Sequence, residues 1–238
     1  MAQVINTNVG ALFAGAALNK SATALQTAQE RLSSGLRINS AKDDATGLGI
    51  ATGYDSQIRG ANMNIRNAND GISAAQINDG YLAQVTENTQ RLREIYVQTG
   101  AVTNTEAAAL IAENTRISGL TTNSVAVTVD ESGGQAGNDG VAFTSATTFA
   151  SLSAFDTELA DIGAARANYG ADMSALASAV ATLQTASVNY SASYSRVMDT
   201  DYAAETSAQA KNNILQQAGT AVLAQANQTP QTVLTLLR

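Results

Sequence analysis

Two closely spaced pairs of carboxylates are the residues of this chain best suited to acid–base chemistry: Asp43 with Asp44, and Asp199 with Asp201. Paired carboxylates can act as general acid and general base. Each pair also stands where a helix is expected to begin, and aspartate is a preferred helix N-cap. The spacing of Ser40 and Asp43 matches a capping box as well. We therefore predict that both pairs cap helices.

The residue types that most enzymes and metal sites need are missing. The chain has no histidine and no cysteine, which excludes Ser-His, Cys-His and HExxH arrangements and most metal sites. The Gly-Leu-Gly at 47–49 begins like a dinucleotide fingerprint, but no strand precedes it and Thr52 occupies its sixth position. The loop from Asp130 lacks calcium ligands at Gly134 and Val141. We predict a protein that is not an enzyme and holds no cofactor or metal.

Charge and composition narrow the class of partner. The net charge of -7 disfavours a nucleic-acid partner. Residues 1–42 carry a net +3, residues 43–198 carry -9 and residues 199–238 carry -1, which suggests a solvated middle and buried ends. Leu, Ile, Val and Phe make up only about a fifth of the chain, near the level at which chains stop folding alone. We expect a protein that completes its core by association.

The sequence contains neither a typical secretory signal nor a membrane-spanning segment. The N-terminus lacks the basic start and unbroken apolar core of a secretory signal. No run of apolar residues is long enough to span a bilayer. We expect no cleaved signal peptide and no membrane insertion.

A heptad stripe from Leu152 to Val197 dominates the pattern of the chain. Large apolar or aromatic residues recur at alternating intervals of three and four, and only Arg166 and Ser187 break the type. That spacing is the 3.5-residue repeat of a coiled-coil seam. The residues expected to form the seam include Leu159, Ile162, Tyr169, Leu176, Leu183, Tyr190 and Tyr194.

A second heptad stripe begins at Ile58 and is the simplest partner for the first. It alternates isoleucine with alanine up to Leu82, includes Asp79, then drops a residue and resumes from Val85 to Thr99. A stripe of isoleucine and alanine accommodates a bulkier stripe of leucine, tyrosine and methionine opposite, so we predict that the two helices pair antiparallel. The expected seam residues here include Ile58, Ile65, Ile72, Leu82 and Leu92.

Shorter patterns complete the chain. Residues 4–36 and the C-terminal segment have amphipathic helical spacing, and residues 103–117 are predicted to form a short helix. Over residues 121–148 the period changes to two around a glycine-rich loop, which predicts a β-hairpin whose second strand contains Val141 and Phe143. The predicted fold is mainly α: a long, elongated antiparallel coiled-coil helix bundle with one small β-hairpin.

Long runs near both ends of the chain are specific enough to identify a family. In the first half they are INTN at 5–8, ERLSSGLRINSAKDDATGLGIA at 30–51, NANDGISAAQ at 67–76 and QRLREIYVQTG at 90–100. In the second half they are RANYGA at 166–171, SRVMDTDYAAE at 195–205 and ILQQAGTAVLAQANQTPQ at 214–231. The chain resembles the bacterial flagellins over about residues 1–118 and 152–238, in a short form.

The resemblance implies a function and a division of the chain. The function is that of the structural subunit of the flagellar filament, which self-assembles into a helical tube for swimming motility outside the cell. Residues 1–42 and 199–238 would form the paired terminal helices of the inner filament core. Residues 43–198 would form an outer helical bundle with the hairpin, and no further outer domain is expected. The implied self-assembly residues of the inner core include Ile5, Val9, Leu12, Leu25, Leu32, Leu215, Ala218, Val222, Leu234 and Leu237.

The resemblance also implies partners. The first is a second copy of the same chain, in a helical homopolymer. Others are the flagellar cap, the hook-associated junction proteins, the export apparatus and an export chaperone that holds the C-terminal helix. A Toll-like receptor of animals senses many flagellins, and the positions matching its contacts are Arg91, Ile95, Gln98 and Glu113. The alternative for Arg91 and Gln98 is a solvated helix face.

Two other functions fit parts of the pattern. A hook–filament junction protein resembles flagellin at both ends, although such proteins are usually longer between the ends. A secreted amphipathic protein that acts on membranes would need a lysine-rich helix face, which this sequence lacks. The filament subunit is the favoured prediction.

Overall fold

The computed structural model describes residues 7–121, 127–128, 134–136 and 143–236, with side chains up to residue 228. The elements in chain order are α1 (Val9–Ser34), α2 (Ala45–Thr99), α3 (Thr105–Ser118), β1 (Val127–Thr128), β2 (Gln135–Ala136), α4 (Leu152–Met198) and α5 (Tyr202–Leu236). The chain divides into two compact units, one of Met1–Tyr54 with Ala192–Arg238 and the other of Asp55–Ser191. Each unit is built around a pair of helices.

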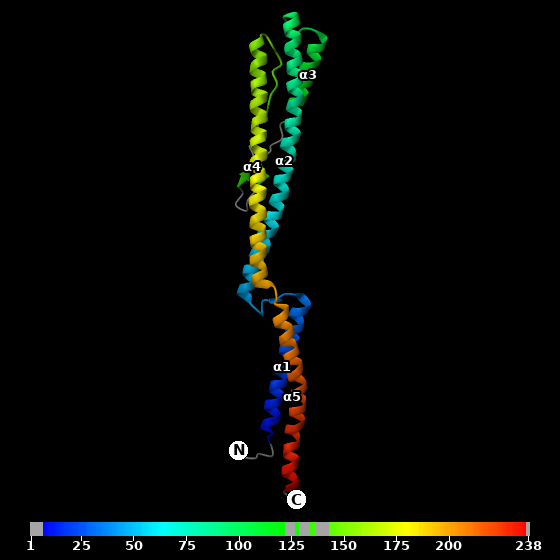
Figure 1. Cartoon of the computed structure of the whole chain (residues 1–238), viewed down its shortest axis with the longest axis vertical. Helices are drawn as coiled ribbons and strands as arrows, with labels where there is room; N and C mark the ends of the chain where they lie inside the picture. The colour runs from blue at the N-terminus through cyan, green and yellow to red at the C-terminus, as the bar shows by residue number, and fades with distance from the viewer. Residues whose placement is uncertain (1–6, 122–126, 129–133, 137–142, 237–238) are drawn as a thin grey trace. The chain divides into compact units, whose positions relative to one another are not determined.

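In the first unit α1 and α5 lie side by side and antiparallel (Figure 1). The side chain of Asn8 caps the start of α1 by accepting a hydrogen bond from the backbone N–H of Ala11 at 3.1 Å. Gly35 ends the helix in the left-handed conformation at φ +72°, which glycine adopts without steric cost. The two helices therefore begin and end where local capping chemistry directs.

Small residues line the contact between α1 and α5. Ala14, Ser21 and Ala28 of α1 are buried. On α5 a Cβ added to Gly219 would lie 3.1 Å from Cδ1 of Leu18, so the two helices approach closely at this point. Leu18, Leu25 and Leu32 are half-buried, whereas other large apolar side chains of the pair are exposed.

A small cluster closes the other end of the first unit. Ile38, Ala51 and Met198 are buried together. Backbone hydrogen bonds join the two chain segments beside it, from Arg37 N–H to the Met198 carbonyl at 2.6 Å and from Thr200 N–H to the Gly35 carbonyl at 3.0 Å. These contacts fix where the chain leaves α1 and where it enters α5.

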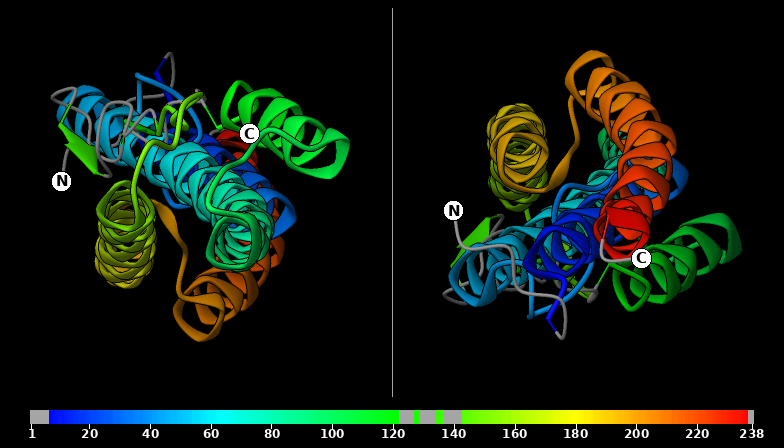
Figure 2. Two further views of the ribbon diagram at one scale, coloured as in Figure 1. Left: turned by 90° about the horizontal axis from the view of Figure 1, so that it is seen from above. Right: turned by 90° about the horizontal axis from the view of Figure 1, so that it is seen from below.

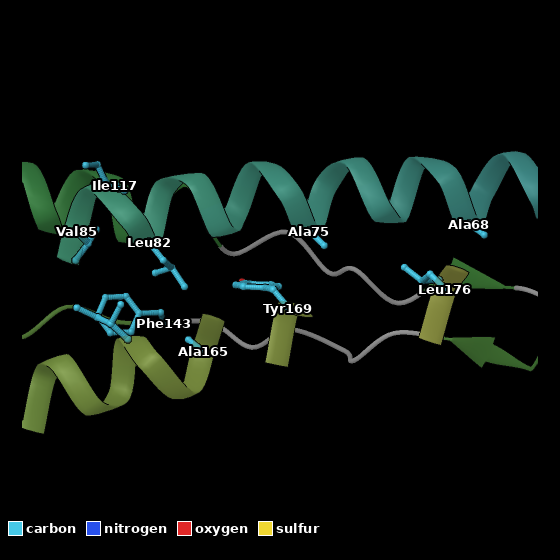
Figure 3. Close-up of a cluster of buried hydrophobic side chains, with 10 residues drawn as sticks. Ala68, Ala75, Leu82, Val85, Ile117, Phe143, Ala165, Tyr169 and Leu176 are labelled. Atoms are coloured by element: carbon cyan, nitrogen blue, oxygen red, sulfur yellow. The ribbon is translucent and has the colours of Figure 1, made fainter. Parts of the chain in front are cut away.

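The second unit contains most of α2 and α4, which pack antiparallel, together with α3. Seen end-on, α3 and α4 lie on different sides of α2 (Figure 2). In the larger core cluster Leu82 and Val85 extend from α2 toward Phe143, and Tyr169 extends from α4 toward α2 (Figure 3). A second cluster surrounds Phe155 of α4. The predicted fold class, mainly helical with antiparallel helix pairs and a small two-stranded sheet, is confirmed.

At every second position of the α2 seam, the buried residue lies one place earlier in the sequence than the predicted one. Asparagine and glycine fill positions where the prediction placed Ile65, Ile72 and Asp79, and those three side chains are half-buried. The heptad of buried positions then continues through Val85 and Leu92 without the one-residue shift that the sequence pattern indicated. The positions of this buried heptad are Ala61, Asn64, Ala68, Gly71, Ala75, Asn78, Leu82, Val85, Thr89 and Leu92, and Ile95 is buried beyond them.

The same offset occurs on α4. Its buried positions in the second unit are Phe155, Glu158, Ile162, Ala165, Tyr169, Asp172 and Leu176. The predicted Leu159, Arg166 and Met173 are half-buried one residue further along. A pattern that counts only large apolar residues skips buried carboxylates and amides, and so selects their apolar neighbours at the edge of the seam.

The hairpin pairs through a different second strand from the predicted one. Val127 pairs with Ala136 and Thr128 with Gln135, in the glycine-rich segment that the sequence pattern assigned to a loop. Phe143 lies outside any strand and is buried in the larger core cluster, and Val141 falls outside the described residues. Val127 and Ala136 both pack on that cluster, so contact with the helices stabilises a sheet of low intrinsic β-propensity.

Candidate functional site

The carboxylate pairs make backbone contacts that stabilise turns and helix starts. Asp43 accepts hydrogen bonds from the backbone N–H groups of Ser40 and Asn39, which hold its pKa below the ordinary value. Asp44 accepts from Gly47 N–H at 2.8 Å at the start of α2, so Asp44 caps the helix. The predicted capping box placed the cap at Ser40, which is wrong because the chain completes a turn before α2 begins.

In the second carboxylate pair Asp201 caps a helix, whereas Asp199 pairs with Leu36 in an isolated backbone bridge. Asp201 accepts hydrogen bonds at the start of α5 from the N–H groups of Ala203 and Ala204, at 2.9 and 3.1 Å. Within the described residues, no three acidic side chains are grouped to hold a metal ion. No helix in that part of the chain has an apolar stretch long enough to cross a membrane.

The largest exposed apolar side chains of the first unit gather on α1 and α5. Phe13 is 78% exposed and Leu12 66% exposed on α1, and Ile214 is 65% exposed on α5. Isolated exposed apolar residues are normal on protein surfaces, but groups of them mark interaction sites. We call the large exposed aliphatic and phenylalanine side chains of these two helices the outward apolar face; they are Val9, Leu12, Phe13, Ile214, Leu215 and Val222.

The self-assembly residues implied by the family resemblance separate into three groups. Four of them, Val9, Leu12, Leu215 and Val222, belong to the outward apolar face, and Ala218 is exposed as well. Leu25 and Leu32 are half-buried. Ile5 and Leu237 lie outside the described residues, as does the side chain of Leu234.

The predicted seam residues also differ in burial. Those fully buried in the second unit are Leu82, Leu92, Ile162, Tyr169 and Leu176. Those half-buried are Ile58, Ile65, Ile72, Leu159, Leu183, Tyr190 and Tyr194. The structure brings most of the first group into the core around Tyr169. Tyr194 packs instead on the small cluster of Ile38 and Met198 in the first unit.

The charged members of the two heptad stripes pair with each other. Nε of Arg166 on α4 lies 2.7 Å from Oδ1 of Asp79 on α2. The hydrogen bond to Asp79 raises the pKa of Arg166 above its ordinary value. Asp79 and Arg166 lie at the edge of the seam, where charges of opposite sign on facing helices favour one pairing of the two helices. This ion pair therefore favours the register of α2 on α4 in which Asp79 lies beside Arg166.

Reversing either charge of this ion pair should destabilise the second unit, and reversing both should restore it. We expect Arg166→Asp to lower the free energy of unfolding by about 1 kcal/mol, because it removes an ion pair and opposes two carboxylates. The double variant Asp79→Arg with Arg166→Asp should recover most of that loss. Urea unfolding of the natural chain, the two single variants and the double variant measures the coupling energy between the two residues. If the double variant recovered none of the stability lost in the single variants, a specific ion pair would be contradicted.

Three of the four residues at the implied receptor positions lie on the surface. Arg91 donates to Glu106 at 2.9 Å and to Glu94 at 3.0 Å. Gln98 is exposed, and Glu113 pairs with Arg116. Ile95 is only 3% exposed and packs in the cluster around Phe155. The position at which the resemblance implied a receptor contact by Ile95 is therefore part of the core.

Buried polar contacts are the features that sequence reasoning missed. Glu158 accepts hydrogen bonds from Ser145 Oγ at 2.9 Å and from Ala146 N–H at 3.1 Å, which holds residues 143–149 against α4. Asn88 of α2 donates to Asn114 of α3 at 2.8 Å. No periodic signal marks these residues, because each is polar and its partner lies far away in the sequence.

Comparison with known proteins gives consistent matches along the chain. The model of the bacterial flagellin N-terminal helical region matches residues 5–148, and that of the C-terminal helical region matches residues 152–237. A flagellin of Xenorhabdus nematophila is 40% identical over 313 aligned positions that cover all of both chains. A flagellin of Salmonella rubislaw is 55% identical over 107 residues, 45% of this chain and 22% of that one. A flagellin of Escherichia coli is 53% identical over a stretch that also covers 22% of its length.

Proposed function

We propose, from the premise that this chain belongs to the bacterial flagellin family, that it polymerises through the outward apolar face of α1 and α5. Flagellins are the subunits of the flagellar filament, so the chain is a structural protein of bacterial motility and not an enzyme. It acts outside the cell, in the filament. The flagellin matches of both halves favour the filament subunit over the junction protein and the membrane-active protein.

The observation that carries this proposal is that large apolar side chains are exposed on α1 and α5, while small residues are buried where the two helices meet. Fully burying a side chain such as Phe or Leu contributes roughly 1.5–3 kcal/mol. In a single chain Phe13, Leu12 and Ile214 contribute little, because they remain largely in water. Contact with neighbouring copies would bury them, and that gain would drive association.

The division of labour between the units follows from the same argument. Residues 1–42 and 199–238 would form the inner core of the filament, where their outward apolar face meets other copies. Residues 43–198 would form the outer bundle, which folds around the Tyr169 core within one chain. The net charges, +3 and -1 at the ends against -9 in the middle, support an outer layer that faces solvent.

We also propose specific binding partners from what is general for the flagellin family. A chaperone that covers α5 before assembly would hide Ile214, Leu215 and Val222. The cap and junction proteins would meet the same helices at the two ends of the filament. A Toll-like receptor would contact Arg91, Gln98 and Glu113, without a direct contribution from the buried Ile95.

Seeded assembly tests the proposal. The full-length chain is mixed with filament fragments, beside a chain that lacks residues 1–42 and 199–238, and both are followed by sedimentation and electron microscopy. We expect uniform tubes from the full chain and monomers from the truncated one. A full chain that stays monomeric with seeds, or a truncated chain that extends them, would contradict assembly through the terminal helices.

A further inference from the structure

The single proline of the chain lies inside a helix, where it removes a hydrogen bond. Pro230 falls within α5 (Tyr202–Leu236). Proline has no backbone N–H, so the bond that would normally run from residue 230 to the carbonyl of the residue four positions earlier cannot form. That residue is Ala226, and its carbonyl needs another donor.

The donor comes from the start of α1. Nδ2 of Asn8 lies 2.8 Å from the carbonyl oxygen of Ala226. The other atom of the same amide, Oδ1, accepts the N–H of Ala11 at 3.1 Å and so caps α1. One side chain therefore satisfies a free donor at the start of α1 and the acceptor that Pro230 leaves free in α5.

The backbones of the two helices come close at this contact. A Cβ added to Gly10 would lie 3.5 Å from Asn8 Oδ1 and 4.0 Å from Cβ of Ala226. The small residues along the rest of the pair, such as Ala14 and Gly219, fill space but would also pack in a neighbouring register. The Ala226 carbonyl is different, because its need for a donor is tied to one proline.

We propose that Asn8 is a positioning residue for assembly, which sets the register of α1 on α5 by bonding to the carbonyl that Pro230 leaves free. A shift of α1 by one helical turn would leave this carbonyl without its donor and move the amide to a carbonyl already bonded within the helix. The two ends of the chain thereby align at one place. This inference rests on the proposed role of the α1–α5 pair in polymerisation.

A double-mutant cycle between Asn8 and Pro230 tests it. Asn8→Ser keeps a good N-cap, because serine caps about as well as asparagine, but removes the amide donor. Pro230→Ala restores the N–H that bonds the Ala226 carbonyl within α5. The matched control is Asn104→Ser at the start of α3. Asn104 is also an asparagine that caps a helix, by accepting from Ala107 N–H, but among the described residues its side chain makes no hydrogen bond to another helix. The critical concentration for extending filament seeds is measured for each chain and for the double variant.

We expect Asn8→Ser to raise the critical concentration about fivefold, because a partly buried acceptor loses its donor. In the Pro230→Ala background the same change should raise it less than about twofold, as should Asn104→Ser in the natural background. If Asn8→Ser raised the critical concentration equally in both backgrounds, the inference would be overturned. Asn8 would then act only as the N-cap of α1, independently of Pro230.

The outcome also separates this inference from the proposed function. If the natural chain does not extend seeds, assembly through the terminal helices fails, and the coupling between Asn8 and Pro230 is then decided by urea unfolding of the same variants. If the natural chain extends seeds and the cycle is additive, only the role of Asn8 fails. A cycle with the expected coupling supports both.

Discussion

Phe13→Asp should abolish polymerisation while leaving the single chain folded. Phe13 is 78% exposed in one chain, so the substitution removes no intramolecular core contact. In an assembled contact it loses roughly 1.5–3 kcal/mol of apolar burial and places a carboxylate where water is excluded, which costs more. We expect the critical concentration for seeded growth to rise by at least about a hundredfold. Sedimentation after seeding measures it.

Two controls accompany this variant. Phe13→Leu keeps a large apolar side chain at the same position and should still extend seeds at a similar critical concentration. Circular dichroism of Phe13→Asp before seeding should match that of the natural chain. Normal growth of Phe13→Asp filaments would show that this part of α1 faces solvent in the polymer, which contradicts the outward apolar face as an assembly surface.

Tyr169→Ala should be among the most destabilising single substitutions in the second unit. Tyr169 is 1% exposed at the centre of the larger core cluster, between α2, α4 and Phe143 (Figure 3). Truncating a large buried aromatic residue to alanine typically costs about 3–5 kcal/mol, through lost burial and the cavity that remains. Urea unfolding followed by circular dichroism should show a transition at clearly lower urea concentration. An unchanged midpoint would contradict a core centred on this residue.

Tyr169→Phe separates the ring from the hydroxyl. The hydroxyl donates to the Thr121 carbonyl at 3.3 Å, so its loss should cost about 1 kcal/mol. Burial, and then the nearby Asp172, raise the pKa of Tyr169 above the ordinary 10.0. Because the folded pKa is the higher one, the stability that this group contributes is fully present below pH 10 and is lost as the pH rises from there through the folded pKa. The phenylalanine variant should therefore lose less stability between neutral and alkaline pH than the natural chain.

The long helices were predictable because their periodicity is sustained and their breaks are marked by local chemistry. Gly35 ends α1 in a conformation that favours glycine, and Asp44 and Asp201 supply caps at the starts of α2 and α5. The antiparallel pairing of α2 with α4 followed from a stripe of small residues facing a stripe of large ones. These signals are local or nearly so, and tertiary contacts reinforce them.

The details that the sequence did not reveal depend on polar groups in contact across long separations. Asn78 and Glu158 are buried in the seams, and a pattern based on apolar residues replaced them with their neighbours. Gln135 and Ala136 form a strand because Val127 and the helix core hold it. Asn8 and Pro230 each have an ordinary local interpretation, as cap and helix breaker, and only the folded pair connects them.

The outward apolar face was only partly predictable for a geometric reason. Leu12 and Leu215 were recognised as members of amphipathic stripes, and such a stripe is normally assumed to face the nearest helix. In this chain small residues and half-buried leucines such as Leu18 occupy that contact, while Leu12 and Leu215 themselves are exposed. A sequence pattern identifies an apolar face but not whether its partner lies in the same molecule.

The ion pair between Asp79 and Arg166 bears on how the second unit responds to mechanical load. A slip by one heptad would move α2 about 10 Å along α4 and would separate this pair. We expect this slipped state to have a higher free energy than the observed register. Strain applied along these helices should therefore favour a return to that register on release.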